Sequence, residues 1–110
     1  MTTTLARGNL NKVFALSPTL TSVAVATITT AEQTYTVTGL QVGDVVISVN
    51  RPNNTPVGVG IVNARVSAAN TLALTWVNPT AGSVTPGAGS FALVIGRPDQ
   101  PGQLPTVFNA

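Results

Sequence analysis

The sequence contains no cysteine and no histidine, and only 7% of its 110 residues are charged. Without cysteine there is neither a disulfide framework nor a thiolate nucleophile. Without histidine the chain lacks the side chain that most often transfers protons at neutral pH. The three acids, Glu32, Asp44 and Asp99, are far apart in the sequence, and Asp44 has the position of a turn residue before a strand. We therefore expect no catalytic, cofactor-binding or metal-binding residue, and a protein that is not an enzyme.

The scarcity of charge also bears on the surface of the protein. Charged residues usually make up about 25% of a soluble domain, and they keep a free monomer in solution. Here 44% of the residues are hydrophobic, a content that argues against disorder. Either threonine, serine, asparagine and glutamine cover the surface, or other protein chains cover much of it. We expect both.

The few basic residues do not form a patch, although the net charge is +2 and the isoelectric point is near 10.0. A nucleic-acid interface requires clustered lysine and arginine, so we expect no nucleic-acid partner. The uncharged stretch 13–31 approaches the length of a membrane span, and Ala24-Val25-Ala26 has the form of a signal-peptidase site. Ser17-Pro18-Thr19 and the many threonines interrupt this stretch, so we expect no membrane partner.

Alternation of apolar and polar residues is the dominant pattern, and it predicts strands. Stretch 23–29 is a further candidate strand whose inward face is ambiguous. Short strands separated by turn signals predict an all-β fold, an antiparallel β-sandwich of jelly-roll-like or Greek-key type. The predicted apolar faces are Tyr35 and Val37; Val45, Ile47 and Val49; Val62, Ala64 and Val66; Leu72, Leu74 and Trp76; and Phe91, Leu93 and Ile95.

The two ends differ from the middle of the chain. Residues 1–20 lack regular alternation, and residues 98–110 contain three prolines among apolar side chains. We therefore expect an N-terminal arm (1–20), a β-sandwich domain (21–97) and a C-terminal tail (98–110). Such arms either hold a neighbouring subunit or pack back on their own domain. Trp76 is expected in the core, and Arg65 is either a solvated surface residue or an anchor in an interface.

The stretch from Tyr35 to Arg97 resembles a family of small structural proteins of tailed bacteriophages. The similar motifs are the strand entrance "VGDVV" (42–46), the hairpin "ARVSAANT" (64–71), the strand exit "WVNPT" (76–80) and a closing strand before "RP". The resemblance implies a virion component, and the nearest role is that of a capsid decoration, or cement, protein.

This resemblance implies a protein on the outer surface of the capsid that bridges adjacent major capsid subunits. Its partners would be the major capsid protein and copies of itself, expected as a homotrimer because shells have local three-fold positions. The alternative is a receptor- or glycan-binding module of a phage tail or head fibre. The residues expected at protein interfaces are Leu5, Arg7, Leu10, Lys12, Val13, Phe14, Arg65, Val107 and Phe108.

Overall fold

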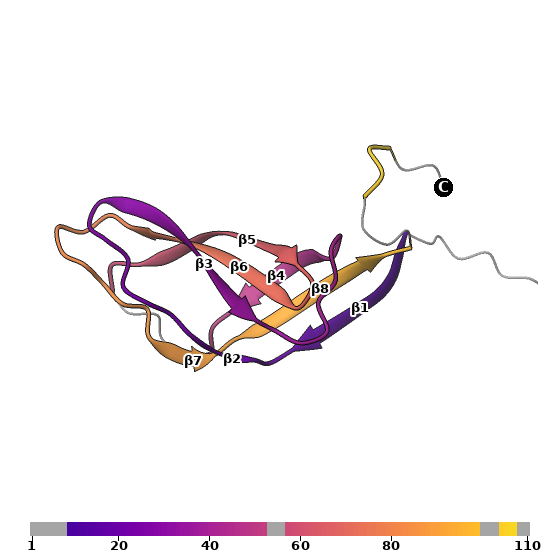
Figure 1. The fold of residues 1–110 in the computed structure, drawn as a ribbon, viewed down its shortest axis with the longest axis horizontal. Helices are drawn as coiled ribbons and strands as arrows, with labels where there is room; N and C mark the ends of the chain where they lie inside the picture. Colours follow the sequence, from indigo (N-terminus) through magenta and orange to yellow (C-terminus); the bar gives the residue numbers. More distant parts are fainter. Residues whose placement is uncertain (1–8, 53–56, 100–103, 108–110) are drawn as a thin grey trace, which may run out of the picture.

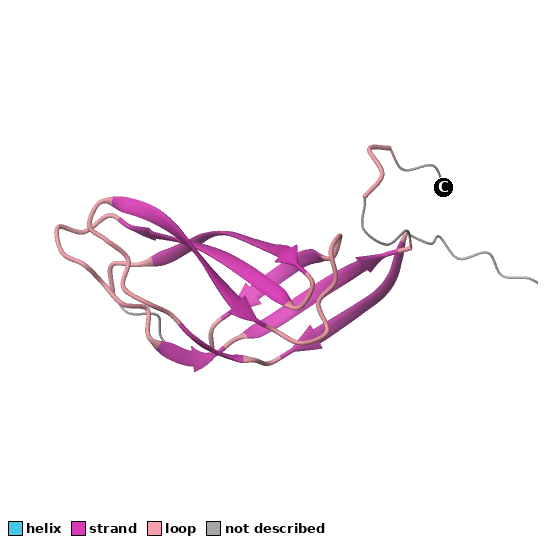
Figure 2. Cartoon of the chain, in the orientation of Figure 1, coloured by secondary structure: helices cyan, strands magenta, loops and turns pink. Residues whose placement is uncertain are grey.

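The computed structural model describes residues 9–52, 57–99 and 104–107, and in this part the chain is folded into strands without a helix (Figures 1 and 2). This confirms the prediction of an all-β protein. The strands are β1 (Leu10–Leu16), β2 (Thr19–Thr21), β3 (Thr29–Thr36), β4 (Val45–Asn50), β5 (Gly60–Ala68), β6 (Thr71–Asn78), β7 (Ala88–Ser90) and β8 (Ala92–Pro98).

The strands form three small antiparallel sheets. The first has the order β1-β8-β4, the second pairs β2 with β7, and the third has the order β3-β6-β5. The strands of the first and third sheets are visible in Figure 1, with the pair β2 and β7 along the lower side of the view. Among the described strands only β5 and β6 are neighbours both in the sequence and in a sheet, so four of the five pairings join strands that are not consecutive in the sequence.

The core lies between the central strands of the two larger sheets. Leu72, Leu74 and Trp76 on β6 and Leu93 and Ile95 on β8 are all completely buried. These residues are the faces that alternation predicted for the two strands. All of them belong to one hydrophobic cluster, which Tyr35, Val37 and Phe91 also join. The three sheets therefore share a single core.

The hairpin between β5 and β6 turns at a residue with a left-handed backbone. Asn70 has φ of 58°, a conformation that asparagine adopts more readily than most residues. The Asn70 side-chain oxygen accepts a hydrogen bond from the Gly39 backbone N–H at 2.8 Å, and the Asn70 backbone N–H donates to Leu40 O at 2.8 Å. The predicted turn of this hairpin is thus tied to the segment that follows β3.

Two predicted strand faces are confirmed only on the C-terminal side of a β-bulge: Val49 on β4, and Ala64 and Val66 on β5, pack against the core as predicted. The residues predicted at the bulge itself, Ile47 and Val62, do not. In β4 the register shifts between Val46 and Ser48, so that Val46 and Val49 pack against the core while Ile47 is 51% exposed. In β5 the shift lies between Ile61 and Asn63, and it leaves Val62 59% exposed. A bulge places two residues opposite one and moves the following side chains to the other face.

Two other expectations for the N-terminal third need correction. Residues 10–16, which we expected to belong to an arm, form β1 and pair with β8 over its whole length. Stretch 23–29, expected as a strand, is mostly loop: Val25 makes a single bridge to Val84, and Ile28 has φ of 47°. Asn11 and Lys12 interrupt the alternation of β1, next to a further shift in register, so its pattern did not indicate a strand.

Candidate interaction surface

Asp44 and Arg97 form an ion pair across 53 residues of sequence. Arg97 donates from Nε to Oδ1 at 2.9 Å and from Nη2 to Oδ2 at 2.8 Å, and Nη2 also donates to Gly39 O at 2.7 Å. The backbone N–H of Gln41 donates to Asp44 Oδ2 at 2.9 Å. The Asp44 side chain is 1% exposed. Asp44 thus has the turn role that its position predicted, and it also fixes the end of β8, which the sequence did not indicate.

Burial of Asp44 by itself would raise the pKa of its carboxyl group. The hydrogen bonds from Arg97 and from the Gln41 amide, together with the guanidinium charge, outweigh this effect and place the pKa below its ordinary value. A carboxyl group with a lowered pKa in the folded state stabilises the fold fully above its unfolded pKa, about 3.9, and loses this contribution as the pH falls through the folded value.

We therefore expect the free energy of unfolding to fall as the pH is lowered from 5 to 2, and to fall less in an Asp44→Asn variant. The reason is that the variant has no carboxyl group to protonate at this position. Urea unfolding followed by circular dichroism at several pH values measures the effect. An equal loss of stability in both proteins would contradict the assignment of acid sensitivity to Asp44.

Phe14 was expected at an interface with another protein, and the structure gives it an intramolecular role. It is paired in register with Ile95, on the core side of β1, and it packs against the core cluster. The guanidinium of Arg97 lies over its ring, 5.0 Å from the centroid. Phe14 is half-buried, and its ring packs against the guanidinium group that binds Asp44.

The remaining predicted interface residues are exposed or lie outside the described residues. Leu10, Val13 and Val107 are 38%, 61% and 66% exposed, and Lys12 is also exposed. Arg65 is exposed and donates to both carboxylate oxygens of Glu32 at 2.8 Å, across β6 on the third sheet. This contact lowers the pKa of Glu32, chiefly through the hydrogen bonds. Leu5, Arg7 and Phe108 lie outside the described residues.

The outer side of the first sheet carries an apolar surface that sequence reasoning missed. At Gly96 in the central strand, a Cβ atom would lie 3.1 Å from both Ile47 Cδ1 and Leu10 Cδ1. The two side chains come from opposite edges of the sheet, from β4 and β1, and converge over this glycine. Val13 is the register partner of Gly96 and therefore shares its face. We call Leu10, Val13, Ile47 and Gly96 the outer apolar face.

The charged residues of these three strands lie on the opposite side. They are Lys12 and Arg97, which are register partners, and Arg97 points toward Asp44 and Phe14.

Ile47 also lines a groove along the seam between β4 and β5, where the exposed Val62 forms part of the other wall. The first sheet thus carries apolar side chains on its outer side as well as on its core side, a pattern that is typical of sheets with both faces covered. Only the bulge in β4 places Ile47 there, so alternation could not find this surface.

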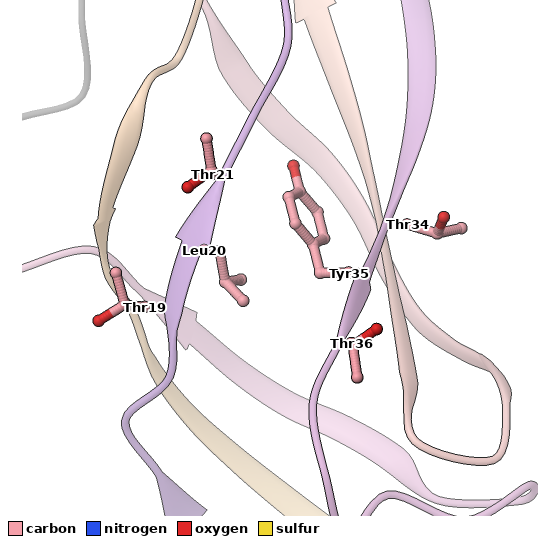
Figure 3. Close-up of a pocket in the computed structure, with 6 residues that line it drawn as sticks. All are labelled: Thr19, Leu20, Thr21, Thr34, Tyr35 and Thr36. Carbon is pink, nitrogen blue, oxygen red and sulfur yellow. The ribbon is translucent and has the colours of Figure 1, made fainter.

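A second hollow lies between β2 and β3 and is lined mainly by threonine (Figure 3). The side chains of Leu20 and Tyr35 point into the space between the two strands. The Tyr35 hydroxyl accepts a hydrogen bond from Trp76 Nε1 at 2.8 Å and lies 2.8 Å from Ser22 Oγ. The only aromatic side chain of the hollow, Tyr35, is 7% exposed, and the Thr34 side chain points away from the space between the two strands (Figure 3).

Within residues 9–52, 57–99 and 104–107, no three potential metal-ligating side chains come together. The same residues include no apolar helix of membrane-spanning length. No protein-family model, no curated protein and no solved structure matches the chain. The candidate surface thus stands on its geometry alone.

Proposed function

We propose that this protein is a bacteriophage capsid decoration protein, which binds the outside of the head and bridges major capsid subunits. In this proposal the two larger sheets form a β-sandwich of jelly-roll or Greek-key type, and the protein acts as a homotrimer. Three linked contacts hold together even when each contact is weak, because the second and third form at a high effective concentration.

The observation that carries the proposal is the combination of few charges with exposed apolar side chains on an ordered sheet. Of the charged residues that the structure describes, Asp44, Arg97, Glu32 and Arg65 are already paired within the fold. Leu10, Val13 and Ile47 are exposed on one side of the first sheet. A surface of this kind is suited to contact with protein, and bridging between protein subunits is what a cement protein does.

The alternative, a receptor- or glycan-binding module of a fibre, would be expected to use exposed aromatic rings or a polar groove. Among the described aromatic residues, Tyr35, Trp76 and Phe91 are buried and Phe14 is half-buried. Among the described residues, those that line the threonine-rich hollow include no exposed ring on which a sugar could stack. We therefore favour the decoration role.

The test is co-sedimentation of the purified chain with heads of the phage that encodes it. We expect the full chain to sediment with heads and a variant lacking residues 1–8 to lose most of this binding, because the predicted contacts Leu5 and Arg7 are removed. The deletion stops at residue 8 so that β1, which begins at Leu10, stays intact.

A matched control is Val57→Thr, which changes a side chain that is 97% exposed in the segment between β4 and β5. This variant should bind heads as the full chain does. Failure of the full chain to bind heads would refute the decoration role. Full binding by the deletion variant would refute the role of the arm.

A further inference from the structure

The turn that leads into β3 holds an isoleucine in a backbone conformation that suits glycine or asparagine. Ile28 has φ of 47°, in the left-handed region, where a side chain branched at Cβ is crowded by the backbone. The Ile28 side chain is 75% exposed, so little burial offsets this strain. Before the turn, Val25 forms a bridge with Val84, and after it, Thr29 is paired with Asn78. These fixed ends hold Ile28 in place, because such strain persists only where the surrounding structure enforces it.

The chain before this turn runs as one bent strand along a single partner. β1 pairs with β8, and β2 pairs with β7, which is separated from β8 only by Phe91. Between the two ladders the Phe91 backbone N–H donates to Pro18 O at 2.9 Å. β1 and β2 therefore follow one another beside β8 and β7 (Figure 1). We call residues 9–25 the N-terminal unit, and residues 26–28 join this unit to β3.

The N-terminal unit is held by residues that are distant in the sequence. Besides the two ladders, Gln33 accepts a hydrogen bond from the Val23 backbone N–H and donates to Val23 O, both at 2.9 Å. Asn78 Nδ2 donates to Val25 O at 2.9 Å. A second copy of the chain has the same partners in the same places, so the unit can make these contacts with another copy. Short connections under strain favour such an exchange, because the opened connection no longer needs the left-handed conformation.

We propose that the N-terminal unit of one copy occupies, in a second copy, the place that the unit has within its own chain. β1 of one copy then pairs with β8 of the other, with Leu10 opposite Pro98 and Phe14 opposite Ile95 as in the single chain. Residues 26–28 form the hinge. Each copy gives one unit and receives one, so the exchange closes into a dimer or a ring of three. The inference goes beyond the proposed function, because it requires no capsid.

Disulfide cross-linking provides the test, because the chain has no native cysteine. Thr21 on β2 and Ala88 on β7 are exposed register partners. The next pair along is hydrogen-bonded, since the Ser22 backbone N–H donates to Gly87 O at 3.3 Å. Thr21 and Ala88 are therefore a non-hydrogen-bonded pair, whose short Cα–Cα distance suits a disulfide.

Thr21→Cys and Ala88→Cys are made in separate full-length chains, unfolded together in urea in equal amounts, refolded without capsids and oxidised. Mass spectrometry distinguishes the mixed dimer from the two homodimers. We expect the mixed dimer to exceed either homodimer about tenfold, because the exchange brings the two positions of different chains into register. The matched control is Thr21→Cys mixed with Thr30→Cys, an exposed position on β3 that pairs with β6, and it should show no such excess.

Two results would overturn the proposal. One is a mixed dimer of Thr21→Cys with Ala88→Cys that is no more abundant, relative to the homodimers, than that of the control. The other comes from the double variant Thr21→Cys with Ala88→Cys in one chain: closure of the disulfide entirely at monomer mass after the same refolding would show that the unit stays on its own domain. Because no capsid is present, either result leaves the decoration role to its own test.

An Ile28→Gly substitution tests the strain that favours the exchange. Glycine adopts this backbone conformation without strain, so the turn should stay closed and the yield of the mixed dimer should fall about tenfold. The matched control is Val42→Gly, the same kind of change at a turn residue that is 53% exposed and is not in the left-handed region. This control should leave the yield unchanged. An Ile28→Gly yield equal to that of Val42→Gly would overturn the assignment of residues 26–28 as the hinge.

Discussion

Replacing Arg97 by methionine should lower the free energy of unfolding by about 3–5 kcal/mol, the usual cost of removing one partner of a buried ion pair. The Asp44 carboxylate is 1% exposed and would keep only the backbone hydrogen bond from Gln41. The charge would then be buried without a counter-ion. Urea unfolding at pH 7 measures the change. The expected loss is easy to detect, because the total free energy of unfolding of a domain is only about 5–15 kcal/mol.

Two controls separate the loss of the pair from the loss of the side chain. Arg65→Met breaks the other ion pair, which is exposed to solvent, and it should change stability little. The double variant Asp44→Leu with Arg97→Met removes both charges, and it should recover part of the loss because no unpaired charge remains. If Arg97→Met unfolds at the same urea concentration as the parent protein, Arg97 does not compensate the charge of Asp44.

Replacing Trp76 by alanine should cost about 3–5 kcal/mol, because it leaves a cavity at the centre of the core. The indole is completely buried, and it meets the Phe91 ring edge-on at a centroid distance of 6.5 Å and an interplanar angle of 79°. The substitution also removes the Nε1 donor to the Tyr35 hydroxyl. Because Trp76 is the sole tryptophan, circular dichroism and not tryptophan fluorescence should follow the unfolding.

The Trp76→Phe variant divides this loss into two parts. It keeps an aromatic ring in the core and removes the donor, so it should cost about 0.5–1.5 kcal/mol, the usual net contribution of one hydrogen bond, because the Tyr35 hydroxyl keeps its contact with Ser22 Oγ. Adding Tyr35→Phe should lower stability further, because the buried Ser22 hydroxyl then loses its hydrogen bond to Tyr35. A cost for Trp76→Phe as large as that for Trp76→Ala would show that the hydrogen bond, and not the packing, dominates.

The core strands could be predicted from the sequence because their alternation is uninterrupted. Leu72, Leu74 and Trp76 are separated by single residues and face the same way, as do Leu93 and Ile95. When one face of a regular strand is buried, every second residue is apolar, and this alternation can be recognised in a short stretch of sequence. The all-β class and the role of Trp76 in the core therefore followed from short stretches of sequence.

The candidate surface could not be predicted in the same way, because it depends on irregularities and on distant pairs. The bulges that expose Ile47 and Val62 leave no mark in the sequence, where every second residue is apolar through both positions. The convergence of Leu10 and Ile47 over Gly96 requires the strand order β1-β8-β4, which joins segments from both halves of the chain. The Asp44–Arg97 pair has no local signal for the same reason.

The pairing of β1 with β8 also determines how the molecule would respond to tension. Leu10 is opposite Pro98, and the Asp99 amide donates to Asn9 O at 2.7 Å, so both extensions of the domain leave from one end of one ladder. A pull between the two extensions would separate these strands one hydrogen-bonded rung after another, starting at that end. The rungs at Leu10 and Lys12 would open first, and the force would reach the buried cluster only where Phe14 pairs with Ile95.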